Sequence, residues 1–98
     1  MRGEAVATAL SFELHAAEAT ITTTITPAGD GVGLTVRIRD EDGGALADQR
    51  VFLRRHGRSL YSARTDADGL LRMPGVERGV YEVACPGVGA TFRLDLRE

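Results

Sequence analysis

Short runs in which apolar and polar residues alternate, separated by clusters of turn residues, constrain this chain more than any other feature. In "VGLTVRIRD", residues 32–40, the even positions up to 38 are aliphatic, whereas the odd positions carry glycine, threonine and arginine. A repeat of two residues places these two sets on opposite faces of a β-strand. Comparable runs recur at intervals of about eight to twelve residues, which predicts an antiparallel β-sandwich or barrel.

The same alternation allows the strands to be placed along the chain. We expect them at residues 6–14, 17–26, 32–40, 50–54, 59–65, 70–73, 80–85 and 90–97. Because the apolar positions change from even to odd between Leu14 and Ile21, a turn or bulge is expected near Ala16 and Ala17. A helix over residues 4–10, where alanine is frequent, is the less favoured alternative.

Length and composition limit what else the chain can be. Its 98 residues suit a single domain over residues 1–98, with 43% hydrophobic residues to form one core. The net charge of −2 provides no field that would attract nucleic acid, and no apolar run approaches the ~20 residues that span a membrane. Cys85 is the only cysteine, so no disulfide can form within the chain, and we expect it to be packed rather than nucleophilic. The chain has no lysine, which excludes a Schiff-base lysine.

Two acidic turns, "DEDG" at residues 40–43 and "DADG" at residues 66–69, raise the question of calcium. Both match the opening of an EF-hand loop, but the glycine stands fourth instead of sixth and no flanking helices are expected. A looser calcium site is a weak alternative, with the ligands Asp40, Asp42, Asp66 and Asp68. Turn chemistry explains these residues better, because aspartate bonds to its own backbone and glycine takes positive φ. We therefore predict no metal site and a hairpin at "DADG" that joins residues 60–66 to residues 70–73.

Arginines cluster in "QRVFLRRHGRSL", residues 49–60, on both sides of an expected His-Gly turn. The functional interpretation of Arg54, Arg55 and Arg58 is a patch that binds anions or nucleic acid. Acidic residues lie close by in the sequence, and arginine is the only basic residue that the chain uses. An arginine-rich face exposed to solvent is therefore the favoured interpretation.

The segment "ATITTTIT", residues 19–26, is the best candidate for a strand that pairs with a partner. It is rich in residues that favour strands, and no charge occurs from residue 19 to residue 28. An edge strand without charges invites pairing with another chain. We therefore take Ile21, Thr23 and Ile25 as an edge that meets another protein, a neighbouring domain or a second copy in a homodimer. An ordinary strand, without a partner, is the alternative.

Two stretches, "VRIRDEDGGALADQRVFLRR" and "SARTDADGLLRMPGVERGVYEVA", resemble the carboxypeptidase regulatory-like family and its bacterial Ig-like and collagen-adhesin B-type relatives. The resemblance covers mainly residues 32–96, and residues 1–31 would be extra N-terminal strands. The matching positions are Asp40, Gly43, Leu46, Val51, Thr65, Asp66, Gly69, Gly79 and Tyr81. Asp48 departs from the pattern, because glycine is common there, and Ala45 stands where proline is common. The resemblance implies an all-β, antiparallel Ig-like or prealbumin-like (transthyretin-like) sandwich of about seven to nine strands.

The resemblance says little about function; we expect a non-catalytic module that binds another protein or acts as a structural spacer, through edge strands or loops. A carbohydrate- or cell-surface-binding module of a larger secreted protein is the alternative. A transthyretin-like hydrolase comes third, because the chain ends "LDLRE" and its histidines, at positions 15 and 56, lie in unrelated contexts. No catalytic residue, cofactor, nucleic acid or membrane is predicted. The chain as given lacks a recognisable signal peptide, so we expect it in the cytoplasm, or outside it if it was cut from a longer chain.

Overall fold

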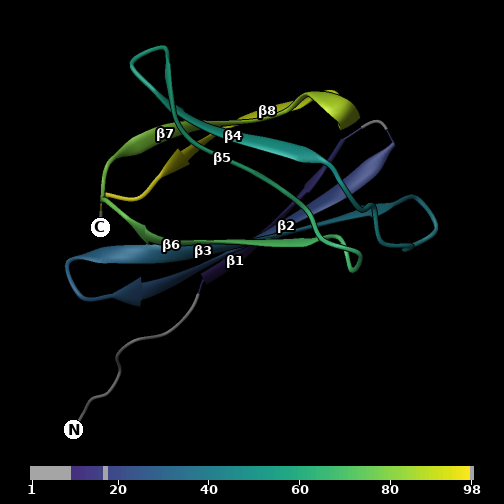
Figure 1. Cartoon of the computed structure of the whole chain (residues 1–98), viewed down its shortest axis with the longest axis horizontal. Helices are drawn as coiled ribbons and strands as arrows, with labels where there is room; N and C mark the ends of the chain where they lie inside the picture. Colours follow the sequence, from purple (N-terminus) through teal and green to yellow (C-terminus); the bar gives the residue numbers. More distant parts are fainter. Residues whose placement is uncertain (1–9, 17, 98) are drawn as a thin grey trace, which may run out of the picture.

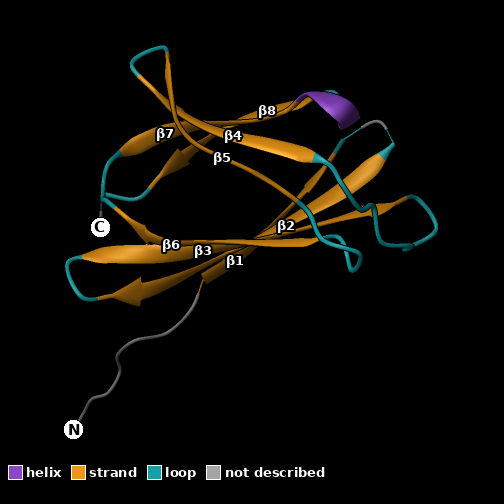
Figure 2. Cartoon of the chain, viewed as in Figure 1, coloured by secondary structure: helices purple, strands orange, loops and turns teal. Residues whose placement is uncertain are grey.

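The described residues form a β-sandwich of two four-stranded sheets (Figure 1). The computed structural model describes residues 10–16 and 18–97. One sheet has the strand order β1-β2-β3-β6, the other has the order β5-β4-β7-β8, and neighbouring strands are antiparallel. The strands are β1 (Leu10–His15), β2 (Ala19–Ala28), β3 (Gly31–Asp40), β4 (Arg50–Arg55), β5 (Arg58–Arg64), β6 (Leu70–Val76), β7 (Val80–Cys85) and β8 (Ala90–Asp95). One turn of 3₁₀ helix, η2 (Pro86–Val88), precedes β8 (Figure 2). The predicted all-β sandwich is confirmed.

The core lies between the facing sides of the two sheets. The even residues of β3 from Val32 to Ile38 are each at most 2% exposed, as their alternation predicts. The opposite sheet contributes Val51, Leu53, Tyr81, Val83, Cys85 and Leu94. Removing each large apolar side chain from water contributes about 1.5–3 kcal/mol, so this layer holds the two sheets together.

Tyr81 fixes the connection between β6 and β7. Its ring is 2% exposed, and its hydroxyl donates a hydrogen bond of 2.7 Å to the carbonyl of Glu77. The backbone N–H of Leu96 donates to the carbonyl of Gly79 at 2.7 Å, which ties the residues after β8 to the same loop. A buried tyrosine needs a partner for its hydroxyl, and here that partner also closes the loop.

Thr65 anchors the long connection between β3 and β4. Its side-chain hydroxyl donates to the carbonyl of Leu46 at 2.7 Å and accepts the N–H of Gln49 at 2.9 Å. Its backbone N–H donates to the carbonyl of Gln49, and its carbonyl accepts the N–H of Asp48. Thr65 is 5% exposed, so these bonds satisfy a polar residue that the core would otherwise exclude.

The hairpin predicted at "DADG" is wrong, although the turn itself is present. β5 and β6 lie in different sheets, so this turn carries the chain from one layer of the sandwich to the other. Asp66 accepts backbone N–H groups from Asp68 at 2.8 Å and Leu70 at 3.1 Å, and Gly69 has φ +73°. A tight turn reverses or redirects the chain in both cases, so turn residues alone do not distinguish a hairpin from a crossing between sheets.

Several strands run further than the sequence predicts. β2 continues through Pro27 to Ala28, and only a two-residue turn separates it from β3, with Gly29 at φ +60°. Pro27 lies beyond Ile25, whose pair with Leu10 is the last one between the described residues of β1 and β2. β6 likewise runs through Pro74, which stands on a strand at the edge of its sheet.

Candidate binding surface

The described strands leave β1 and β8 as edges on the same side of the sandwich, because both line one groove. The prediction that residues 19–26 form an edge is wrong: β2 pairs with β1 on one side and with β3 on the other. Ile21, Thr23 and Ile25 are 1%, 3% and 7% exposed, so they belong to the core. The prediction failed because the sequence did not show that the strand expected at residues 6–14 pairs with β2 and takes the outer position.

The groove between β1 and β8 is largely apolar. Its larger part has a volume of about 400 Å³ and is lined by Phe12, Glu13, Leu14, Ile21, Thr23, Phe92, Arg93, Leu94 and Asp95. A smaller hollow of about 200 Å³ involves Leu10 and Leu96. Asp95 lines both hollows, so they adjoin along the open side of the sandwich. The groove thus lies where the two sheets separate and their edges are unpaired.

Leu10 and Phe12 stand on the core-facing side of β1 but remain largely in solvent. They lie opposite Ile25 and Thr23 of β2, and directly paired residues share one face of a sheet. Leu10 is nevertheless 61% exposed and Phe12 49% exposed. The alternation predicted for this strand is correct for its described residues, but the opposite sheet does not cover these two side chains. Val6, which belongs to the same predicted strand, lies outside the described residues.

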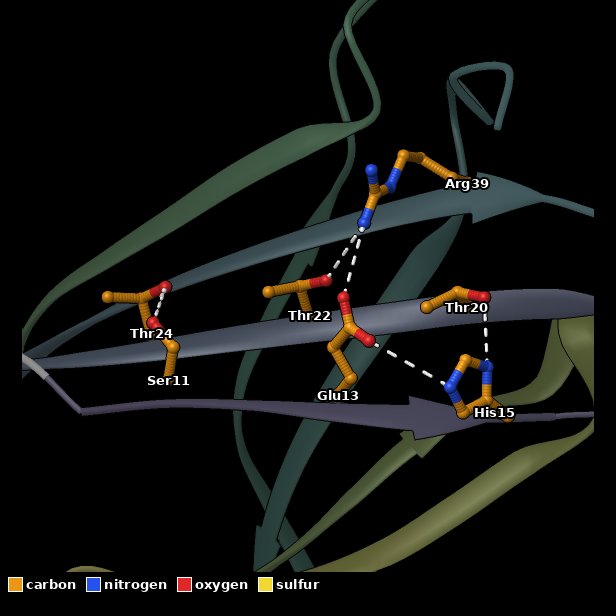
Figure 3. A network of polar contacts seen from close by, with 7 residues as sticks. All are labelled: Ser11, Glu13, His15, Thr20, Thr22, Thr24 and Arg39. Atoms are coloured by element: carbon orange, nitrogen blue, oxygen red, sulfur yellow. Dashed lines mark hydrogen bonds and ion pairs between the residues drawn. The ribbon is translucent and has the colours of Figure 1, made fainter. Parts of the chain in front are cut away.

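The outer face of β1, β2 and β3 carries a polar network (Figure 3). The His15 imidazole lies 3.3 Å from the Thr20 hydroxyl and 3.8 Å from the Glu13 carboxylate, and Arg39 lies 3.7 Å from Glu13. A hydroxyl, an imidazole and a carboxylate in one row suggest nucleophilic catalysis. Here the His15 side chain is 74% exposed on a sheet face, and the imidazole–carboxylate distance exceeds a hydrogen bond. We interpret the network as surface contacts that fasten β1 to β2.

The two acidic turns have the same local structure. Asp40 accepts the N–H groups of Asp42 at 2.9 Å and Gly44 at 2.8 Å, as Asp66 does in the second turn. In both turns one carboxylate oxygen therefore serves the backbone, which is the turn chemistry predicted from the sequence. In the part of the chain that the structure describes, no three His, Cys, Asp or Glu side chains gather as a metal-binding group, and this includes Asp40, Asp42, Asp66 and Asp68.

The arginines considered as a possible anion-binding patch, against the favoured interpretation of a solvent-exposed face, are only partly brought together. Arg54 pairs with Glu82 at 3.7 Å, and its guanidinium lies 5.5 Å from the Phe52 ring centre. Arg55 contacts a different aromatic ring, because its guanidinium lies 5.6 Å from the centre of the Tyr81 ring. Arg58 follows the tight turn at His56 and Gly57, which both have positive φ. Sequence reasoning missed Arg78 and Arg97, which lie near Arg55 in space but far from it along the chain.

The described cysteine and tyrosines are buried or half-buried. Cys85 is 1% exposed, and burial raises the pKa of its thiol to about 11, so the thiolate that a nucleophile needs is disfavoured. Tyr81 is buried and Tyr61 is half-buried, so neither ring stands free as a platform for a sugar. Among the described aromatic residues, Phe12 is the most accessible, and it lines the groove.

Comparison with protein-family models, curated proteins and solved structures finds no match to this chain. The resemblance to carboxypeptidase regulatory-like domains therefore stays a prediction. Within residues 10–16 and 18–97, no helix is long and apolar enough to cross a membrane.

Proposed function

We propose that this chain is a non-catalytic β-sandwich module that binds another protein through the open side between β1 and β8. The observation that carries the proposal is the exposed apolar pair Leu10 and Phe12 beside a groove of about 400 Å³. Exposed apolar residues that adjoin a groove mark binding surfaces more often than isolated ones do. The expected partner is an extended segment with alternating apolar residues.

Main-chain pairing would supply affinity, and the groove would supply selectivity. Among the described strands, β1 and β8 each have one neighbour, so each presents backbone N–H and C=O groups on its outer side. An added strand beside either edge places every second side chain toward the sandwich. Those side chains would meet Phe12, Leu14 and Phe92, which line the groove.

We propose further that the connectivity is Ig-like rather than prealbumin-like. In support, the chain crosses after β3 to the sheet in which β4 and β5 pair, and β6 then returns to the sheet of β3. Ig-like domains also carry a tyrosine near a sheet-to-sheet corner whose hydroxyl bonds to the backbone just upstream, as Tyr81 does to Glu77. This assignment concerns the fold and does not by itself indicate a partner.

The test is to select peptides from a random library on the immobilised chain and to measure their binding to two variants. Phe12→Glu places a charge at the groove, whereas Leu60→Glu is the matched control, since both parent residues are 49% exposed. Selected peptides should alternate apolar and polar residues, bind the parent and the Leu60→Glu variant equally, and lose binding to Phe12→Glu.

Two results would change the conclusion. If no peptide is enriched, or if Phe12→Glu binds as well as the parent while remaining folded, the groove is not the binding surface. If sedimentation shows a dimer of the parent that Phe12→Glu dissociates, the occupant is a second copy rather than another protein.

A further inference from the structure

We propose a binding site for a phosphoryl group at the end of the sandwich where the β4–β5 turn, the β6–β7 loop and the residues after β8 meet. A hollow of about 370 Å³ is lined there by Arg55, His56, Arg78, Gly79, Val80 and Arg97. The three arginines come from three different segments, so the fold assembles a cationic cluster that no stretch of sequence contains. Figure 1 shows the β4–β5 turn and the β6–β7 connection at the same end of the molecule.

Arg55 is held in place without a carboxylate. Its guanidinium lies over the Tyr81 ring, 5.6 Å from the ring centre. On another side it packs against Gly79, where an added Cβ would lie 2.9 Å from the guanidinium carbon. Among the described residues, the ion pairs do not include Arg55. A stacked guanidinium that is already ordered loses little freedom when it binds an anion.

The other two arginines of the hollow differ in the hydrogen bonds and ion pairs that they already form. Arg78 is exposed and donates one hydrogen bond, at 3.4 Å, to the carbonyl of Leu96. Arg97 forms a two-point pair with Asp95, at 3.0 and 2.7 Å, which leaves it partly neutralised. Arg55 and Arg78 are therefore the two arginines of this hollow that form no ion pair within 4 Å with a described carboxylate.

The arrangement fits a phosphoryl group better than a carboxylate. A carboxylate presents two oxygens in one plane, which one guanidinium can satisfy. A phosphoryl group presents three oxygens in different directions, and here donors approach from three segments of the chain. Free phosphate and a small phosphate ester share this chemistry, and the hollow has room for either. The site shares no lining residue with the hollow of about 400 Å³ between β1 and β8, but a third hollow of about 600 Å³ adjoins both, with Arg55 and Phe92 in its lining.

The test is a titration of the intact chain with potassium phosphate, glycerol phosphate and potassium acetate, each against potassium chloride at equal ionic strength. Amide resonances of His56, Gly57 and Gly79 should shift and saturate with phosphate or its ester, and not with acetate. A tighter fit for glycerol phosphate identifies an ester as the natural source, whereas equal affinity identifies inorganic phosphate.

Three variants distinguish binding in this hollow from a non-specific attraction of anions to the arginines of the chain. Arg55→Gln and Arg78→Gln should each weaken phosphate binding about tenfold or more, as expected when a charge-assisted hydrogen bond is lost. Arg72→Gln, which removes an exposed arginine from the other sheet, should leave the affinity unchanged. Arg78 also lines the smaller hollow beside β1, so Arg55→Gln is the more selective variant. Equal weakening by Arg72→Gln, saturation with acetate, or no shift beyond the chloride control would overturn the proposal.

Discussion

Replacing Gly69 with alanine should destabilise this chain much more than the same replacement at Gly43. The two glycines occupy the same place in two equivalent acidic turns, with φ of +73° and +87°. They differ in their surroundings. A Cβ at Gly69 would lie 2.5 Å from the carbonyl oxygen of Ile38 and 3.1 Å from the nitrogen of Leu46, whereas a Cβ at Gly43 would have nothing within 4 Å.

The expected magnitudes follow from these contacts. A Cβ in the left-handed region costs about 1–2 kcal/mol at either position, and the reduced freedom of the unfolded chain offsets about 0.4–1 kcal/mol of that. At Gly69 the new Cβ also displaces the Ile38 backbone, which accepts the N–H of Leu46 at 3.0 Å and donates to the carbonyl of Gly69 at 2.8 Å. Each such bond contributes about 0.5–1.5 kcal/mol. We therefore expect a loss of about 2–4 kcal/mol for Gly69→Ala and about 1 kcal/mol or less for Gly43→Ala.

Urea unfolding followed by circular dichroism measures both free energies of unfolding from the shift of the midpoint at constant slope. Gly69→Val should cost more still, because a β-branched residue resists positive φ. Equal losses for the two alanine variants would refute the reasoning, since it would mean that Gly69 does not approach Ile38.

Three further predictions concern single side chains. Asp48 has φ +60° and is exposed, so Asp48→Gly should raise the free energy of unfolding by about 0.5 kcal/mol in the same urea assay, despite the loss of an exposed pair with Arg64. Tyr81→Phe removes the buried hydrogen bond to Glu77 and should cost about 1–2 kcal/mol, while an unchanged midpoint would argue against that bond. Burial raises the pKa of Cys85 from 9.0 to about 11, so its contribution to stability is complete below pH 9 and is lost as the pH rises through 11. The stability of the parent relative to Cys85→Ala should therefore fall between pH 9 and 11, and a thiol reagent at pH 8 should label Cys85 only as fast as the chain opens.

The strands could be predicted from the sequence because one physical signal determines them. Burying one face of a sheet imposes a repeat of two residues, and the run from Val32 to Ile38 shows it without interruption. Turn chemistry is equally local: Asp40 and Asp66 bond to backbone groups within four residues, as the "DxDG" pattern indicates. Asp48 illustrates the same point, since it takes positive φ at a position where glycine is common in the family that the sequence resembles.

The pairing of strands could not be predicted in the same way. Nothing in the alternation of β2 reveals whether β1 lies beside it, so the pattern of Ile21, Thr23 and Ile25 fits an edge as well as it fits their observed place in the core. The crossing at "DADG" depends on which sheet β6 joins, which is decided by long-range packing. The cluster of Arg55, Arg78 and Arg97 depends on three connections that meet only in the folded chain.

The central claim is that, among the described strands, β1 and β8 are the edge strands that flank the groove, and residue-by-residue amide hydrogen exchange tests it most directly. An edge strand protects only every second amide, whereas a strand with two neighbours protects all of them. The structure predicts alternating fast and slow exchange along β1 and β8, and continuous protection along β2 from Ile21 to Ile25. Alternating exchange in β2, together with continuous protection in β1 or β8, would contradict the claim that β1 and β8 are edge strands.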